Sequence, residues 1–390
     1  MEYRMIAPCY FGAESATAFD IRRVGAKDVT VTDGRVAFTG DADVLAAANL
    51  HSRCAERILL LLKAGRADTF DALFDLVYSV PWEELMEADA AFPVKGSSLS
   101  SQLSSVPACQ SIVKKAVVER LKKGHGVQIL PESGMEYRIR FSIRKNEAEI
   151  MLDTSGEGLH KRVYRKKSTL APIKETLACA MLDLGRIYPD SAVRDPFCGS
   201  GTLCIEAAMK ALHIAPGLRR RFAAERYAFV PAGTFERART ASLEQVVRSA
   251  PFEAVGYDID PDAVALAAHN AKLAGVDAHV RFRTADVKDF APPESCLVFT
   301  NPTYGERLGD AAGAAALEHT LGERLARSRV KGAYIITADA DFEAHFGRKA
   351  QRRRKLYNGM IPCQVYMYYD TGHAQGKGGP APFVKKENAL

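Results

Sequence analysis

The sequence predicts an α/β protein in which a doubly wound, mostly parallel sheet follows two smaller α+β modules. Strand-like apolar runs alternate with amphipathic helical stretches from about residue 168 onward, which is typical of a parallel sheet covered by helices. The first sixty-odd residues follow a different order, with a clear hairpin between two short strands. A polar and basic passage separates this first half from the alternating part. We expect ligands at the carboxyl ends of the parallel strands.

The first module, residues 1–65, is predicted to be ferredoxin-like. Asp33-Gly34 lies between two strand-like runs and is a strong signal for a two-residue hairpin turn. The elements around it follow the order strand, helix, strand, strand, helix, strand, which is that of a ferredoxin-like module. The expected strands span residues 3–8, 29–32, 35–38 and 57–62, and the expected helices span 14–24 and 44–50.

The second module, residues 66–160, is predicted to combine two helices with three strands. Val113, Val117 and Leu121 recur at helical spacing and mark one apolar face. The polar and basic residues 153–167 are predicted to form a hinge into the third part. The expected helices span 70–80 and 111–121, and the expected strands span 127–130, 137–143 and 148–152.

The third part, residues 161–370, is the predicted doubly wound domain. Residues 371–390 are rich in Gly, Pro and Lys, so we expect a disordered tail. The strands of the domain are expected at 192–195, 253–257, 280–283, 296–300, 334–337 and 364–369, and its helices at 173–184, 202–212, 262–274 and 314–325.

Composition indicates a large soluble protein of the cytoplasm. The chain has 390 residues, of which 47% are hydrophobic and 26% charged, enough for more than one core. No apolar run approaches the length of a membrane span, and the amino terminus lacks a signal-peptide pattern. Eight cysteines lack a paired metal spacing, and His125 and His213 have no partners at ligand spacing, so we expect buried thiols and no metal. The net charge of +6 is unevenly placed, which suggests a phosphate-rich partner.

A glycine turn marks the candidate cofactor site. Asp195 ends an apolar strand, and Gly199-Ser200-Gly201 leads into a helix that opens at Thr202. Glycines let the backbone approach a ligand, and the amino end of a helix offers unpaired N–H groups. Asp258 ends the next strand, where a carboxylate can accept both ribose hydroxyls, and Asp286 follows the third, where a side chain can meet an adenine edge. Taken alone, Asp195 is equally compatible with an ordinary turn or helix cap.

A dinucleotide site is the alternative for this turn. It would need a third glycine where Cys204 stands. Asp195 and Glu206 also place negative charge near the turn, which would repel a pyrophosphate but suit a cationic, zwitterionic ligand. S-adenosylmethionine therefore fits the pattern better than NAD.

Asn301-Pro302-Thr303-Tyr304 follows the fourth strand and is the candidate acceptor site. The lone pair of an exocyclic base amine is delocalised into the ring and must localise on the nitrogen before it attacks a methyl group. The Asn301 side-chain oxygen and the Pro302 main-chain oxygen can accept the two N–H bonds, and Tyr304 can stack on the base. In isolation, an Asn-Pro pair is more often a plain turn. Its position at a strand end, in register with the other clusters, favours a functional role.

Four segments resemble a known family. Residues 195–208 read DPFCGSGTLCIEAA, which is close to the first motif of THUMP-containing RNA methyltransferases. GYDID at 256–260 matches the second motif, and DTSGEGLHKRVYR at 153–165 looks like the junction after the THUMP module. KLYNG at 355–359 resembles a carboxyl-terminal signature of the family. The similarity runs to about Asp370 and points, within the family, to bacterial enzymes that methylate guanine N2 of large-subunit rRNA.

The resemblance implies a Rossmann-like class I methyltransferase domain preceded by ferredoxin-like and THUMP modules, with S-adenosylmethionine as methyl donor and guanine N2 as acceptor. Carried over to this sequence, the acceptor site falls on Asn301, Pro302 and Tyr304. The usual NPPY motif reads NPTY here, which puts loop stiffness and base choice in question at Thr303, and Val163 replaces a usual glycine. With Ser200 of the turn, the cofactor-binding candidates are Asp195, Phe197, Gly199, Ser200, Gly201, Thr202, Asp258 and Asp286.

Clusters of basic residues suggest a path for RNA. Such runs supply phosphate contacts, which position nucleic acid without reading its sequence. A single run is usually a solvated surface, but here four runs border the catalytic domain, the last two at 219–221 and 348–355. The THUMP-like module would measure distance or shape on the RNA. The RNA-binding candidates are Lys161, Arg162, Arg165, Lys166, Lys167, Arg219 and Arg220.

Several functions remain open beside methylation of guanine N2 in large-subunit rRNA. A tRNA guanine-N2 methyltransferase would have the same modules. A DNA adenine-N6 methyltransferase would use an acceptor motif of similar logic, although the front half of the chain argues against DNA. A non-catalytic RNA-binding assembly factor is a different class, and the intact Asp195, Asp258, Asp286 and Asn301 argue against it.

Overall fold

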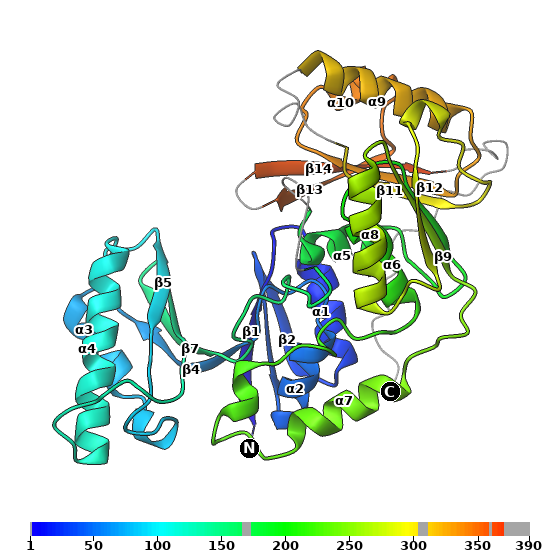
Figure 1. The fold of residues 1–390 in the computed structure, drawn as a ribbon. Coiled ribbons are helices and arrows are strands. Elements are labelled where there is room, and N and C mark those ends of the chain that lie inside the picture. Colours follow the sequence, from blue (N-terminus) through cyan, green and yellow to red (C-terminus); the bar gives the residue numbers. More distant parts are fainter. Residues whose placement is uncertain (1, 166–172, 303–310, 359–360, 370–390) are drawn as a thin grey trace, which may run out of the picture.

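The computed structural model describes residues 2–165, 173–302, 311–358 and 361–369, which contain two seven-stranded sheets (Figure 1). The tail predicted at 371–390 lies outside the described residues, as do Lys166, Lys167, Thr303 and Tyr304. Within the described ranges, no helix is both long and apolar enough to cross a membrane.

The first sheet joins the two amino-terminal modules. Its strand order is β2-β3-β1-β4-β7-β6-β5, and β4 pairs with β1 on one side and with β7 on the other. The order and pairing of the first four strands confirm the ferredoxin-like module. Its elements are β1 (Tyr3–Pro8), α1 (Glu14–Arg23), β2 (Lys27–Thr32), β3 (Arg35–Gly40), α2 (Ala42–His51) and β4 (Leu59–Arg66).

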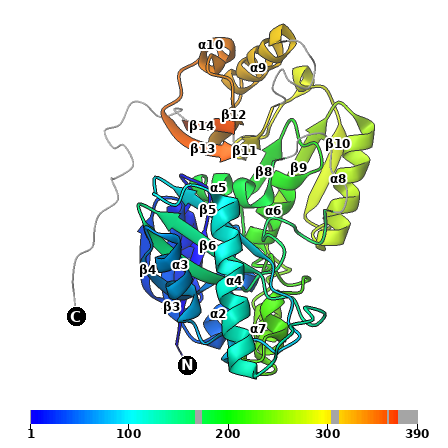
Figure 2. The ribbon, with the colours of Figure 1, turned by 90° about the vertical axis from the view of Figure 1, so that its left-hand side faces the viewer.

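The second module differs from the prediction at two strands. The strand predicted at 127–130 is wrong, because Gly126 ends α4 with a φ of +67° and the exposed Ile129 has no sheet to pack against. A strand that the sequence VKGSSL does not indicate, β5, pairs instead with β6, and Gly96 leaves room there for the ring of Phe141. Helices α3 and α4 pack together on the outer side of the module (Figures 1 and 2). The elements are α3 (Phe70–Tyr78), β5 (Val94–Leu99), α4 (Val106–His125), β6 (Ile139–Arg144) and β7 (Glu147–Asp153).

The second sheet is the predicted doubly wound domain. Its order is β10-β9-β8-β11-β12-β14-β13, and β14 runs antiparallel to both of its neighbours. One face packs on α5, α6 and α8 and the other on α9 and α10. The sequence did not indicate α7, α10 or β13. The elements are α5 (Glu175–Leu184), β8 (Ala192–Asp195), α6 (Thr202–Ala211), α7 (Thr234–Glu244), β9 (Glu253–Asp258), α8 (Pro261–Ala274), β10 (Val280–Thr284), β11 (Leu297–Thr300), α9 (Ala311–Ala326), β12 (Gly332–Thr337), α10 (Phe342–Phe346), β13 (Arg352–Asn358) and β14 (Ile361–Tyr369).

The passage predicted as a hinge is a packed junction in the structure. Asp153 is buried and forms an ion pair with Arg57 at 2.6 Å. The buried Thr154 and Ser155 are hydrogen-bonded to Asn49 of α2 at 3.0 and 2.6 Å. Aromatic side chains that follow α6 in the chain also reach back into the core of the amino-terminal modules. They are Phe222, Tyr227 and Phe235.

Candidate active site

Three acidic residues and Asn301 share one edge of the second sheet. Asp195 at the end of β8 is level with Gly256 of β9, and Asp258 at the end of β9 is level with Thr284 of β10. Asp286 comes shortly after β10, and Asn301 follows β11, which pairs with the other side of β8. Because all four strands are parallel, their carboxyl ends meet at the edge where ligands bind in such sheets.

The glycine turn between β8 and α6 is held open by its backbone conformation and its neighbours. Gly199 and Gly201 have φ values of +48° and +84°, and a Cβ on Gly201 would lie 2.7 Å from the ring of Phe282. Asn270 of α8 donates a hydrogen bond to the Ser200 carbonyl oxygen at 3.0 Å. Only glycine fits at Gly201, so the amino end of α6 can face a ligand at close range.

Asp258 links the turn to the neighbouring strand. Its Oδ2 accepts a hydrogen bond from the Gly199 N–H at 2.8 Å, and its Oδ1 accepts one from the Asp260 N–H at 3.1 Å. Each carboxylate oxygen has a second lone pair, so the side chain can still accept ligand hydroxyls. Asp286 accepts a hydrogen bond from the Lys288 N–H at 2.9 Å, which lowers the pKa of its carboxyl.

Asp195 connects the glycine turn to the end of β11. Its Oδ1 accepts hydrogen bonds from the Thr300 hydroxyl at 2.7 Å and from the Phe197 N–H at 3.1 Å. Thr300 is the last residue of β11, directly before Asn301. Burial raises the pKa of Asp195 to about 7. A cationic ligand beside this carboxyl would favour its ionised form.

The segment predicted to be the acceptor motif begins at the end of β11. Asn301 is partly buried and Pro302 is buried. The predicted stacking residue, Tyr304, lies outside the described residues and stays a prediction. The Asn301 side-chain amide and the Pro302 main-chain carbonyl therefore follow a strand that pairs with β8, the strand before the glycine turn.

Family comparisons match all three parts of the chain. A ferredoxin-like domain of the RlmL type matches residues 4–59, and a THUMP domain matches 67–153. The model described as "RMKL-like, methyltransferase domain" matches residues 162–367, which is more than half of the chain. The chain belongs to the RMKL-like methyltransferase family.

Relatives of this RMKL-like methyltransferase are known from sequence and structure. "Putative RNA methyltransferase YpsC" of Bacillus subtilis (strain 168) is 39% identical over the full length of both chains. "Ribosomal RNA large subunit methyltransferase K/L" of Syntrophotalea carbinolica is 35% identical over 95% of this chain and 54% of the relative, so the chain spans about half the length of the K/L relatives. The solved structure of "SMU.472, a putative methyltransferase complexed with SAH" is 37% identical, with a TM-score of 0.87 over 95% of this chain and 98% of that chain. The family and the SAH-bound relative confirm the prediction of S-adenosylmethionine as cofactor.

Arg162 and Arg220 were expected to contact RNA, and the structure corrects both. The Arg162 guanidinium is buried, pairs with Glu206 at 3.3 Å and donates to the Arg53 carbonyl oxygen at 3.0 Å. The buried Arg220 donates to the carbonyl oxygens of Gly158 and Glu157 at 2.9 and 2.7 Å. These guanidinium groups satisfy main-chain carbonyls of the junction and cannot reach a phosphate from inside the protein.

Arg165 is also largely withdrawn from the surface. It pairs with Glu175 at 2.8 Å and donates to the Thr202 hydroxyl at 3.1 Å, so it braces the start of α6. Lys161 and Arg219 are exposed and can still meet RNA. A basic run in sequence does not distinguish a solvated side chain from one that closes a junction.

The negative charge expected from Glu206 near the turn is neutralised inside the protein. Glu206 is buried, pairs with Arg162 and accepts a hydrogen bond from the Tyr164 hydroxyl at 2.9 Å. Asp195 and the missing third glycine are therefore the features that disfavour a pyrophosphate. The sequence pattern does not single out Ile259, whose side chain is 69% exposed directly after Asp258.

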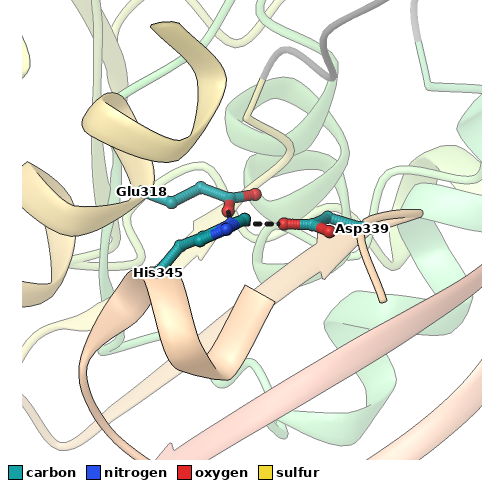
Figure 3. Close-up of side chains that lie close together, drawn as sticks. All are labelled: Glu318, Asp339 and His345. Atoms are coloured by element: carbon teal, nitrogen blue, oxygen red, sulfur yellow. Dashed lines mark hydrogen bonds and ion pairs between the residues drawn. The ribbon is translucent and has the colours of Figure 1, made fainter. Parts of the chain in front are cut away.

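A compact polar cluster lies just past the carboxyl end of β12 in the RMKL-like domain (Figure 3). His345 of α10 places its Nδ1 2.8 Å from Asp339, which follows β12, and 3.2 Å from Glu318 of α9. Burial raises the pKa of Glu318 to about 7, with a further increase from Asp339. Burial acts to lower the pKa of His345, but its hydrogen bonds to the two acids outweigh this, so the pKa is raised. Three ligand atoms lie close enough to hold a metal ion, but their shared hydrogen bonds account for the arrangement without one.

Proposed function

We propose that this protein transfers a methyl group from S-adenosylmethionine to the exocyclic N2 of a guanine in large-subunit rRNA. The observation that carries the proposal is the position of Asn301 and Pro302 at the end of β11, beside the strand that bears the glycine turn. The matched THUMP domain and the names of the K/L relatives support an RNA substrate. The buried cysteines fit a reducing compartment, and we place the reaction in the cytoplasm.

One group of residues at this edge binds the cofactor, and another binds the base. Asp258, Asp286 and the glycine turn hold S-adenosylmethionine, which supplies an electrophilic methyl group. The Asn301 side-chain oxygen and the Pro302 carbonyl oxygen accept the two N–H bonds of the guanine amine. These acceptors favour a tetrahedral nitrogen whose lone pair has left the ring, and they stabilise the positive charge that develops on it. No strong base is needed, because the methylated nitrogen becomes acidic and loses its proton afterwards.

Identification of the methylated nucleoside tests this proposal. Ribosomal RNA from cells without the gene is incubated with the protein and labelled cofactor, digested to nucleosides and analysed by mass spectrometry. N2-methylguanosine in the large-subunit RNA supports the proposal. N6-methyladenosine, or label only in tRNA added to the same reaction, would assign a rival function. SAH binding without any methyl transfer would favour an assembly factor.

A further inference from the structure

The hairpin of β13 and β14 extends beyond the ligand-binding edge of the second sheet. Gln364 of β14 is level with Thr337, the last residue of β12, so Ile361 lies three residues past this edge. At about 3.3 Å per residue, the hairpin projects about 10 Å. In Figure 1 it points to the side of the molecule on which the THUMP domain lies.

An exposed aromatic ring of the ferredoxin-like module sits against this hairpin. The ring of Phe11, from the loop after β1, contacts Tyr357 of β13 edge to face, with centroids 5.9 Å apart. Phe11 is 49% exposed and rests on Gly34, where a Cβ would be 3.4 Å from the ring. The Arg354 guanidinium donates to the Gly12 carbonyl oxygen at 2.9 Å, so the loop is fastened to the hairpin. The ring is therefore both open to solvent and fixed in position.

Cations of β13 lie on the Tyr357 side of Phe11. Lys355 is exposed and its Nζ lies 5.3 Å from the centroid of the Tyr357 ring. Arg352 is exposed on the same edge strand. Two acids lie on the other side of the ring. Asp33, directly before Gly34, is exposed, whereas Glu14 accepts hydrogen bonds from the N–H groups of Gly12 and Gly34, so its charge is partly satisfied within the loop. A flat exposed ring beside cations matches a polyanion with flat groups, which is single-stranded nucleic acid.

We propose that Phe11, Tyr357 and Lys355 form a platform for an unpaired nucleotide of the RNA near the methylated base. Phe11 stacks on the base, Tyr357 positions the Phe11 ring, and Lys355 contacts a phosphate. Three strand spacings separate β13 from β11, about 14 Å, so the bound nucleotide is a few positions from the target. The inference rests on the proposed function, because it takes RNA as the substrate. It gives the ferredoxin-like module a direct part in substrate binding.

The test compares Phe11→Ala with Phe19→Ala in the full chain. Phe19 is a matched control, since it is an exposed phenylalanine of the same module with a cation, Arg23, 5.8 Å from its ring. The probe is a single-stranded RNA oligonucleotide that contains 2-aminopurine, and the same sequence as a duplex. Phe11→Ala should weaken binding of the single strand roughly 5- to 150-fold, the range for loss of one stacked base. Phe19→Ala should change the affinity for the single strand less than twofold, and Phe11→Trp should have an affinity close to that of the wild type.

Further measurements separate stacking from a loss of structure. Phe11→Leu keeps an apolar side chain but removes the ring, so it should bind RNA as poorly as Phe11→Ala while SAH affinity and melting temperature stay at wild-type values. Lys355→Ala should lower the slope of log affinity against log salt by about one. Equal loss for single strand and duplex, or no loss for Phe11→Ala, would overturn the platform. A concentration-dependent dimer that Phe11→Ala abolishes, with RNA binding unchanged, would assign the surface to a second copy.

The proposed function and the platform can fail separately. If the methylated nucleoside is not N2-methylguanosine but Phe11→Ala raises the KM for RNA, the base assignment fails and the platform stands. If N2-methylguanosine forms and both phenylalanine variants have wild-type KM, the platform alone is wrong.

Discussion

At the scale of single residues, Asp195 combines burial with a position between the proposed cofactor and acceptor sites. Because burial raises its pKa to about 7, raising the pH from 6 to 8 converts it to the ionised form that a cationic ligand favours. We expect the affinity for S-adenosylmethionine to rise over this interval and to level off above it. Asp195→Asn should weaken binding about tenfold, or about 1.4 kcal/mol, and remove the pH dependence. Calorimetry at pH 6, 7 and 8 checks this, and a pH-independent wild type would contradict it.

Arg162 stabilises the folded protein from inside, whereas the arginine at 221 is exposed on the surface. Its guanidinium is enclosed with Glu206, so Arg162→Leu leaves a buried carboxylate without its partner and should destabilise the protein by about 3–5 kcal/mol. The exposed Arg221 is the control, and Arg221→Leu should change stability by less than about 0.5 kcal/mol. Thermal unfolding measures both variants. A stable Arg162→Leu protein with weakened RNA binding would restore the original interpretation of a phosphate contact.

At the scale of elements, Glu318, Asp339 and His345 tie α9, the end of β12 and α10 together in a pH-dependent way. The raised pKa values of Glu318 and His345 mean that their stabilising contributions are complete at low pH and are lost as the pH rises through the folded-state values, about 7 for Glu318. The pKa of Asp339 is lowered, so its stabilising contribution has the opposite pH dependence and is lost only in acid. Between pH 6 and pH 8 the link should therefore weaken.

Hydrogen exchange checks this prediction. After correction for intrinsic rates, amides of α9 and α10 should exchange several-fold faster at pH 8 than at pH 6. Glu318→Gln should flatten this difference, whereas the exposed Glu323→Gln on the same helix should keep it. Exchange that does not change with pH would rule out the link. A rise in melting temperature with Zn²⁺ or Mn²⁺ that His345→Ala abolishes would identify a metal site instead.

At the scale of the whole molecule, the catalytic part and the amino-terminal modules share a core. The ring of Tyr227 stacks on Tyr137 at 4.7 Å, and its hydroxyl donates to the Asp153 carbonyl oxygen at 2.7 Å. Tyr227→Ala should cost about 3–5 kcal/mol through the cavity it leaves, whereas Tyr227→Phe should cost only about 1 kcal/mol. Calorimetry should show one shifted transition for the whole chain. A second transition appearing in Tyr227→Ala, with the methyltransferase part unshifted, would contradict a shared core.

The local pattern of apolar and turn residues in the sequence was enough to predict much of this architecture. The strand ends that carry Asp195, Asp258 and Asn301 follow from apolar runs and turn residues, and they share one edge as expected. Interactions between distant parts of the chain were not visible. Gly96 lies in a strand that pairs with β6 and leaves space for the Phe141 ring, and the buried Arg220 donates to carbonyl oxygens of the junction. The sequence also could not show that β4 joins two modules into one sheet.

The most direct test of the account concerns Asn301. Asn301→Ala should reduce methyl transfer to rRNA by at least about a hundredfold, since it removes an acceptor needed in the transition state, and should leave the Kd for SAH within about threefold. Asn301→Asp keeps an acceptor oxygen and should retain part of the activity. The decisive measurement is the yield of N2-methylguanosine per enzyme under saturating cofactor for wild type and Asn301→Ala. Loss of the product with intact SAH binding is the predicted result, and an unchanged yield would contradict the central claim.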